Sequence, residues 1–451
     1  MRGHFTHGST RLTQDMAPSV PVRCSCGAIS PMLLVMFEKS PDNRSSHGGM
    51  CADGCPVIPR SFNTQHKPKM TRLQLPILAL ATLLAATLSA EGASTGLRWI
   101  DSNTNLTVYG DIRLRYEADW DSQTTTGAPR DDRNRGRIRA RLGFGYRLSD
   151  EWSAGARVRT GNSRSQQSPH LTFSADRGGR DDLDFVVDRY FLQYKRGTFT
   201  GWGGRNGSPF WQQNELFWDE DVTPTGLAGT YDWKLAKGTL SAIAGAFYLP
   251  DGGYDLNGRM LAGQLKYTAP INKSQITTAA GLFYMDGASG ARNLRNQNGA
   301  RDYLIGVAGA QWSIPIRKLP FALGADLFHN FKDYAAGDPL SMIGAIDHHN
   351  ETLGYVLSAQ LGQLKDKNNW LLGYYYSHIE TFSVNASYAQ DDWHRFGSAT
   401  QTDASDFEGH EFRAGYALTK SINILARLYL VEAITTVQNG SRFRVDLNWK
   451  F

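Results

Sequence analysis

The chain has 451 residues, 46 of them glycine, and a formal net charge of +5 at neutral pH. No run of 20 apolar residues follows residue 90, which excludes a membrane-spanning helix from that part of the sequence. Residues 91–451 hold 39 basic and 39 acidic residues. Any basic surface in this part therefore depends on where the charges lie, because their sum is zero.

Met70 begins a segment with the pattern of a secretory signal peptide. Arg72 supplies positive charge, an apolar stretch runs from Leu73 to Leu88, and small residues follow from Ser89 onward. We expect residues 70–92 to be removed on secretion. An uncleaved anchor is the alternative, but the apolar stretch is short and polar sequence follows it closely.

Residues 1–69 do not fit a secreted protein, because a signal peptide normally starts the chain. We expect them to be a wrongly assigned, disordered extension, and residues 93–451 to be the mature domain. All four cysteines lie in the extension, and their spacing is a weak match to known zinc sites. We therefore expect neither a metal site nor a disulfide in the mature protein.

From residue 106 onward, apolar and polar side chains alternate with a period of two, which is typical of β-strands. In residues 137–148, for example, Ile138 and Leu142 fall on one face, and Arg139 and Arg141 fall on the other. In a soluble β-sandwich the apolar face would form the core. In a transmembrane barrel the same face contacts lipid, and the polar face lines a water-filled lumen.

We expect sixteen strands of this kind, with eighteen as the alternative number. Most have about the length that crosses a bilayer at a tilt. The expected strands are 106–116, 137–148, 152–160, 184–195, 198–205, 226–235, 239–249, 259–268, 276–285, 303–314, 320–331, 352–363, 369–379, 409–418, 422–433 and 441–451.

The connections between these strands alternate in length. Long connections at 117–136 and 161–183, for example, alternate with short ones at 149–151 and 196–197. Short periplasmic turns and long external loops are the arrangement of bacterial outer-membrane barrels. The sequence therefore predicts an all-β fold, a transmembrane antiparallel up-and-down β-barrel with both termini in the periplasm.

The last expected strand ends with an aromatic residue at the end of the chain. Trp449 and Phe451 lie on the apolar face of this strand. A terminal aromatic residue in this position resembles the signal that is read by the outer-membrane barrel assembly machinery. We therefore expect this machinery and outer-membrane lipid as partners; an ordinary C-terminal strand is the alternative.

Motifs rich in arginine, aromatic residues and glycine occur at Gly110–Tyr116, Asp132–Arg135, Arg137–Gly143, Trp152–Gly155, Thr160–Ser163, Pro209–Trp211, Glu215–Asp219 and Pro224–Ala228. Together they resemble the putative porin family of proteobacterial outer membranes. The resemblance covers about residues 106–230 and departs from the family at Gly203–Asn206. Alginate-export barrels share the arginine-rich opening strands. The resemblance implies the outer membrane of a Gram-negative bacterium and passive passage of solutes.

Arginines dominate the polar face of the first three expected strands. Neighbouring strands lie about 4.8 Å apart, so the guanidinium groups would form a continuous wall that needs water, acidic partners or anions nearby. Two interpretations stay open: a ladder paired with acidic side chains that is structural only, and a wall that also attracts anions. The expected basic wall consists of Arg113, Arg115, Arg137, Arg139, Arg141, Arg147, Arg157, Arg159 and Arg189.

Residues 206–225 form the third long connection and carry an acidic and aromatic cluster. In general porins the third loop folds inward and narrows the pore. If this loop does the same, its carboxylates would face the basic wall across the lumen; an acidic external loop is the alternative. The candidate constriction residues are Glu215, Asp219, Glu220, Asp221, Trp211 and Trp218.

No set of residues predicts catalysis, a metal or a cofactor. Asp347–His349 lie in a long loop without a suitably spaced third ligand. Ser377, His378 and Asn385 are near one another in sequence, but a catalytic set must also share one side of the protein and lie within reach.

The sequence therefore favours an outer-membrane porin, a passive diffusion channel for small hydrophilic solutes with a preference for anions. Two alternatives remain: an exporter of an anionic, alginate-like polysaccharide, and a barrel enzyme such as a lipase or protease. Small anionic solutes are the expected ligands, and nucleic acid is not expected. The sequence does not decide between a monomer and a homotrimer.

Overall fold

The computed structural model describes residues 105–162, 166–175, 184–250, 256–287, 301–317, 319–393 and 404–451. The expected extension and signal peptide lie outside these residues. Within the described residues, no helix is long and apolar enough to cross a membrane. The strands are β1 (Leu106–Trp120), β2 (Arg133–Arg147), β3 (Trp152–Thr160), β4 (Leu171–Ala175), β5 (Phe185–Arg196), β6 (Phe199–Arg205), β7 (Thr225–Leu235), β8 (Gly238–Pro250), β9 (Leu256–Ile271), β10 (Ser274–Asp286), β11 (Tyr303–Ile316), β12 (Leu319–Asn330), β13 (Met342–Ile343), β14 (Ile346–Asp347), β15 (Leu353–Gly362), β16 (Trp370–Ile379), β17 (Phe407–Ala417), β18 (Ile422–Ala433) and β19 (Asn439–Lys450).

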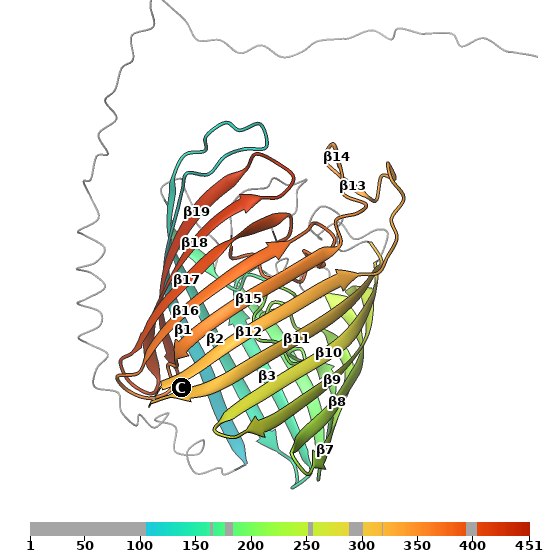
Figure 1. Ribbon diagram of the computed structural model, residues 1–451. Coiled ribbons are helices and arrows are strands. Elements are labelled where there is room, and N and C mark those ends of the chain that lie inside the picture. Colours follow the sequence, from blue (N-terminus) through green and yellow to red (C-terminus); the bar gives the residue numbers. More distant parts are fainter. Residues whose placement is uncertain are drawn as a thin grey trace, which may run out of the picture. The chain divides into compact units, whose positions relative to one another are not determined.

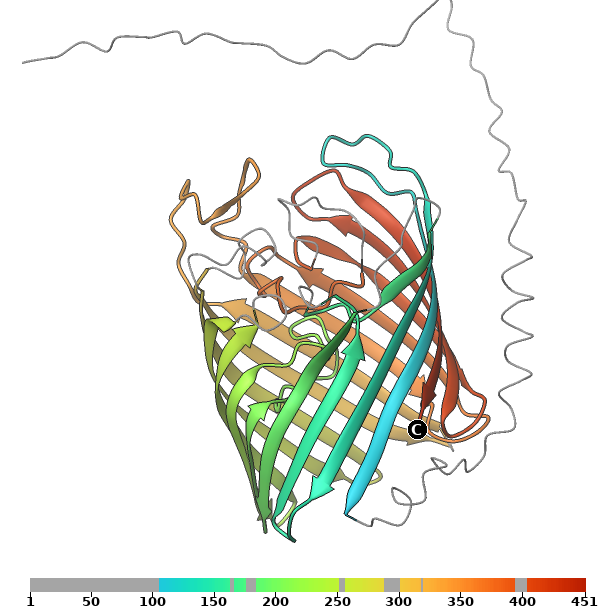
Figure 2. The same ribbon diagram turned by 180° about the vertical axis from the view of Figure 1, so that it is seen from behind.

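The strands form a closed antiparallel barrel (Figures 1 and 2). Successive long strands pair with one another, and β1 also pairs with β19, which closes the sheet. The short strand β4 pairs with β2 beyond the end of β3, and β13 and β14 form a separate hairpin in an external loop. The expected sixteen barrel strands are thus confirmed, and the alternative of eighteen is wrong.

The period of two places apolar side chains outside the barrel and polar ones inside. On β2, Leu142, Phe144 and Tyr146 are 42%, 39% and 42% exposed, whereas Arg139 is 2% exposed. An apolar exterior stabilises a barrel in lipid, because the hydrocarbon takes the place of a second packed layer.

The two ends of the chain's barrel domain meet at the seam between β1 and β19. The backbone N–H of Gly110 donates to the carbonyl of Phe451 at 3.0 Å, and the N–H of Phe451 donates back at 3.1 Å. A Cβ atom at Gly110 would lie 2.6 Å from Cζ of the Phe451 ring, so only glycine leaves room for that ring. Trp449 packs beside Phe451 on the outside of the barrel, with ring centroids 5.3 Å apart.

Connections alternate in length around the barrel, with two departures from the expectation. The connections between β8 and β9 and between β18 and β19 are short, because β9 and β19 begin earlier in the sequence than the alternation of side chains predicts. At the opposite end, tight turns such as 197–198 and 236–237 join the strands.

The inside of the barrel is divided into two unlike halves. Strands β17 to β19 and β1 to β6 carry arginines and carboxylates inward. Strands β8 to β12 and β15 to β16 carry apolar side chains inward, among them Phe247, Phe283 and Phe328, and these belong to one buried hydrophobic cluster. Two loops fill the space between the halves and contribute to the same cluster.

Candidate functional site in the barrel lumen

The basic wall lies on the inner surface of adjacent strands. Arg113 and Arg115 come from β1, Arg137, Arg139 and Arg141 from β2, Arg157 and Arg159 from β3, and Arg189 from β5. Arg147 is different: it lies at the turn end of β2, is exposed, and donates to the side chain of Asn105 at 3.2 Å and 3.0 Å.

Carboxylates on the same strands pair with most of these arginines. The two side chains Arg139 and Arg141 lie 2.9 Å and 2.6 Å from Asp111. Arg115 lies 2.7 Å from Asp446, which reaches it across the seam. Charge pairing within the wall therefore offsets much of the repulsion between neighbouring guanidinium groups.

A β-bulge turns a carboxylate toward the lumen at a position where the alternation of side chains along the strand predicts an outward one. The register between β3 and β5 shifts between Arg157 and Val158, so Asp188 and Arg189 both face the lumen. Asp188 is fully buried and lies 2.5 Å from Arg157 and 4.0 Å from Arg159. A bulge can aim two consecutive side chains to one face because it adds a residue to one strand.

Closure of the barrel extends the wall beyond the residues that the sequence pointed to. Arg442 and Arg444 on β19 lie beside β1, where Arg442 is 2.7 Å from Asp119. Arg413 on β17 and Arg427 on β18 continue the wall, and both pair with Glu411, at 2.6 Å and 3.5 Å. Alternation of side chains along these strands predicts that the arginines point inward. Which residues lie next to them follows only from the pairing of β19 with β1.

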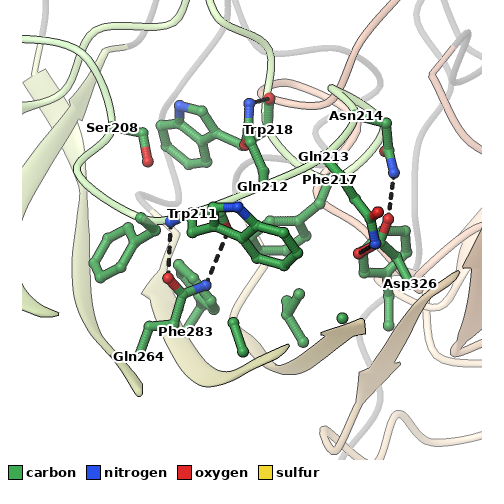
Figure 3. Close-up of a pocket in the computed structure, with 15 residues that line it drawn as sticks. Ser208, Trp211, Gln212, Gln213, Asn214, Phe217, Trp218, Gln264, Phe283 and Asp326 are labelled. Atoms are coloured by element: carbon green, nitrogen blue, oxygen red, sulfur yellow. Dashed lines mark hydrogen bonds between the residues drawn. The ribbon is translucent and has the colours of Figure 1, made fainter. Parts of the chain in front are cut away.

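The loop 206–224 crosses the inside of the barrel and is anchored first on the apolar half (Figure 3). The Trp211 backbone N–H donates to the side-chain amide oxygen of Gln264 at 2.8 Å, and that amide donates back to the Trp211 carbonyl at 3.0 Å. Asp326 on β12 accepts from the side chains of Gln213 at 2.8 Å and Asn214 at 2.5 Å. These bonds fix the first part of the loop to β9 and β12.

Small residues on the barrel wall make the recess that receives this part of the loop. A Cβ atom at Gly309 would lie 3.1 Å from the Trp211 ring and 2.5 Å from an Asp326 carboxylate oxygen. Deeper in the loop, Phe217 packs against Phe283 and Phe328, with ring centroids 4.7 Å and 5.7 Å apart.

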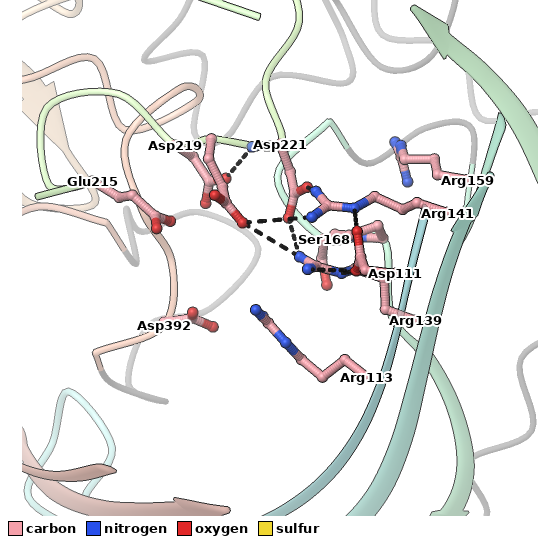
Figure 4. A network of polar contacts seen from close by, with 12 residues as sticks. Asp111, Arg113, Arg139, Arg141, Arg159, Ser168, Glu215, Asp219, Asp221 and Asp392 are labelled. Carbon is pink, nitrogen blue, oxygen red and sulfur yellow. Dashed lines mark hydrogen bonds and ion pairs between the residues drawn. The ribbon is translucent and has the colours of Figure 1, made fainter. Parts of the chain in front are cut away.

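The same loop reaches the basic wall at its other end (Figure 4). Asp221 lies 2.7 Å from Arg141 and 3.3 Å from Arg139, and Glu220 lies 3.5 Å from Arg139. Burial alone would raise the pKa of Asp221, but Arg139 and Arg141 outweigh it and hold that pKa at about 2. The loop therefore spans the lumen between an apolar anchor and an ionic one.

Two other carboxyl groups of the loop, Glu215 and Asp219, form no ion pair with a wall arginine among the described residues. Burial, reinforced by Glu220, raises the pKa of Glu215 to about 7. Burial, reinforced by Glu215 and Asp221, raises the pKa of Asp219 well above its ordinary value. Asp219 and Glu215 therefore hold protons at pH values where surface carboxyl groups are ionised.

A second loop, beginning after β16, packs against the first one inside the barrel. Residues 381–389 are each at most 1% exposed. The Asp219 N–H donates to the Tyr388 carbonyl at 2.8 Å, and the Gln390 side chain donates to Glu215 at 3.0 Å. The rings of Trp218 and Tyr388 stack with centroids 5.4 Å apart. The sequence predicts residues 380–408 as the longest connection, but no periodicity indicated that part of it is buried inside the barrel.

The remaining candidate groups are not assembled into a reactive site. Ser377 faces the inside of the barrel and is fully buried, whereas His378 is partly exposed and contacts Glu408 at 3.0 Å. His348 contacts Glu351 at 2.7 Å in an external loop. Among the described residues, no group of His, Cys, Asp or Glu side chains is arranged to hold a metal ion.

A closed antiparallel barrel with an apolar outer surface and a charged lumen crossed by loops defines an outer-membrane β-barrel of the porin class. Residues 121–268 match the model of the putative porin family, which confirms the family resemblance. The protein is thus placed in the outer membrane of a Gram-negative bacterium.

Solved structures of outer-membrane proteins are similar to this chain at low sequence identity, and the first of them shows the same fold. The high-pH structure of Pseudomonas putida OprB is 12% identical, with a TM-score of 0.51, over 77% of this chain and 94% of that one. A BenF-like porin from Pseudomonas fluorescens Pf-5 is 11% identical, with a TM-score of 0.44, over 77% of this chain and 98% of that one. No curated protein matches the sequence.

Proposed function

We propose that the protein is a passive diffusion channel for small hydrophilic solutes that favours anions. The observation that carries the anion preference is the charge of the lumen. The inward arginines of the wall outnumber the inward carboxylates on the same described strands, which are Asp111, Glu117, Asp119, Asp188, Glu411 and Asp446.

Two carboxyl groups with raised pKa values add to this preference. Glu215 and Asp219 lie in the middle of the lumen but carry less negative charge at neutral pH than their number implies. A low-dielectric wall focuses the remaining positive field into the lumen and raises the local concentration of anions.

The alternatives receive less support. An exporter of an anionic polysaccharide needs a continuous path for a polymer, and two loops cross the lumen. A lipase or protease needs an assembled catalytic set, and Ser377 and His378 face opposite sides of their strand. A homotrimer stays a proposal that chemical cross-linking in the membrane can test.

Single-channel recording in planar bilayers tests the proposed function. We expect discrete conductance steps and a reversal potential in a KCl gradient that shows anion preference. This preference should weaken as salt rises, because ions screen exposed charges beyond about 10 Å at 0.1 M. Absence of conductance would refute the channel, and cation preference would refute the anion selectivity.

A further inference from the structure

The arginines of the wall are not equivalent, because they differ in how they are neutralised. Arg139, Arg141 and Arg157 each lie within 3 Å of a wall carboxylate. Within the described parts of the chain, Arg113 and Arg189 have no carboxylate oxygen within 4.0 Å. Arg113 instead donates through Nε to the side-chain oxygen of Asn448 at 2.7 Å. Its terminal nitrogens extend from the wall into the lumen (Figure 4).

A small polar cavity lies where Arg113 points. It has a volume of about 20 Å³, which is room for one water molecule or one small ion. The walls come from β1, from β18, from residues 167–170 before β4, and from the two loops that fill the barrel. Its lining includes Arg113, Arg427 and His170, together with the six carboxyl residues Glu215, Asp219, Glu220, Asp221, Asp391 and Asp392.

His170 supplies an independent sign that this cavity is built for a ligand. Its side chain is buried, and Nε2 has no hydrogen-bond partner within the described part of the chain. A buried polar atom without a partner is costly and calls for an explanation. Burial, together with Arg115, Arg137 and Arg113, lowers the pKa of His170 well below its ordinary value. The ring is therefore neutral and lies in a positive potential.

Most of the carboxyl groups around the cavity are paired with other arginines or have raised pKa values. Asp392 lies 2.6 Å from Arg444, Asp221 lies 2.7 Å from Arg141, and Glu220 lies 3.5 Å from Arg139. Burial raises the pKa of Glu215 to about 7 and the pKa of Asp219 well above its ordinary value, so both carry less negative charge than exposed carboxylates do. Arg113 and His170 are therefore the donors that the cavity offers to an anion, although acidic residues also line it.

We propose that this cavity binds one small monovalent anion, held by Arg113 and His170, and that Arg113 sets the anion preference of the channel. The inference rests on the proposed channel function and names the residue that decides selectivity. The ligand chemistry is a single negative charge of the size of chloride or of a carboxylate group. Wall arginines that are locked to carboxylates contribute to the shape of the lumen more than to its selectivity.

Paired measurements on Arg113→Gln and Arg157→Gln test this proposal, because each removes one positive charge from the wall. For the unmodified channel we expect conductance to saturate with rising KCl or potassium formate, as a binding site fills. Arg113→Gln should weaken anion binding by about tenfold or more, as expected when a hydrogen bond to a charged group is lost. Arg157→Gln and Arg189→Gln should leave saturation in place.

Two further variants keep the test decisive. Arg113→Lys retains the charge and should retain the anion preference, and His170→Ala should weaken saturation without removing charge. Conductance that saturates with either chloride or formate supports the site. Comparing the two salts shows whether the site prefers a halide ion or a carboxylate. Saturation with neither salt, or equal losses in Arg113→Gln and Arg189→Gln, would overturn the proposal while conductance itself still supports the channel.

Discussion

At the scale of single residues, Asp188 controls the charge balance on one side of the lumen. It is fully buried and contacts both Arg157 and Arg159. Strict alternation along β5 would point its side chain toward lipid. The bulge that turns it inward leaves no signature in the sequence, since a register shift depends on both paired strands.

Replacing Asp188 with asparagine should destabilise the barrel. Two buried guanidinium groups would then lack their carboxylate, and losing one partner of a buried ion pair costs about 3–5 kcal/mol. Urea unfolding in lipid vesicles, followed by tryptophan fluorescence, measures this loss. The double variant Asp188→Asn with Arg157→Gln should recover part of the stability. A single variant as stable as the unmodified barrel would contradict this account.

Phe451 and Gly110 form a matched pair of residues at the seam. We propose that the terminal aromatic residue marks the chain for barrel assembly, so deleting Phe451 should lower the amount of folded barrel in the membrane. Gly110→Val should have a similar effect with the signal intact, because a side chain at that position meets the Phe451 ring. Heat-modified mobility on gels measures the folded fraction. An unchanged folded fraction in both variants would show that neither the ring nor its site matters.

At the scale of elements, the loop 206–224 is held by complementary anchors on opposite walls. Its acidic and aromatic residues could be found in the sequence. The path of the loop could not be predicted, because it depends on glycines of β11 and β12 that leave room for the loop. The burial of the second loop was not predicted either, since irregular segments have no period from which to infer burial.

Filling the recess should release the first loop from the apolar wall. Gly309→Leu places a side chain where the Trp211 ring and the Asp326 carboxylate now lie. We expect a larger single-channel conductance, because the constriction moves out of the lumen. Gly263→Leu is the control: its Cβ meets only a carbonyl oxygen at 3.9 Å. Equal conductance in the two variants would argue against an inward-folded loop.

The contact between the two buried loops should loosen as pH rises. Glu215 faces Asp219, Glu220 and Asp221 of its own loop, with Asp391 and Asp392 of the second loop, Arg427 of β18, Arg113 of β1 and His170 also lining the space. Because the packed arrangement raises the pKa of Glu215 to about 7, it binds a proton that separated loops would release near pH 4.5. Packing is therefore fully favoured below about pH 4.5 and weakens as pH rises to about 7, and the raised pKa of Asp219 acts in the same direction.

We expect conductance at fixed salt to increase between pH 5 and pH 9. The variant Glu215→Gln with Asp219→Asn removes both titrating groups and should make conductance independent of pH in this range. A decrease toward alkaline pH in the unmodified channel would reverse the sign of this coupling and contradict it.

At the scale of the whole molecule, the barrel itself was predictable from the sequence. Alternation, terminal aromatic residues and connection lengths are local signals, and they gave the sixteen strands and their antiparallel order. The filled interior was not predictable. The inward side chains of β8 to β12 are mostly small or apolar, and such a face can line a lumen or pack in a core. The segments that fill it are irregular connections, which carry no period that indicates burial.

The mature protein should begin near residues 91–94. We propose that the chain starts at Met70 and loses residues 70–92 on secretion, because the signal pattern begins there. Mass spectrometry of the protein from purified outer membranes measures its N-terminus directly. Peptides that contain Cys24 or Cys51 in that fraction would show that residues 1–69 are made and retained.

The seam between β1 and β19 has a consequence for the order of folding. Every other neighbouring pair of long strands is joined by a connection, whereas Arg115 and its partner Asp446 are 331 residues apart. Contacts between distant residues form late, since loop closure must come first. The contacts across the seam should therefore be the last to form, and they include two ion pairs, Arg115 with Asp446 and Arg442 with Asp119. Once the seam has closed, reopening it would expose these charges together, so we expect the finished barrel to unfold slowly even where its overall stability is modest.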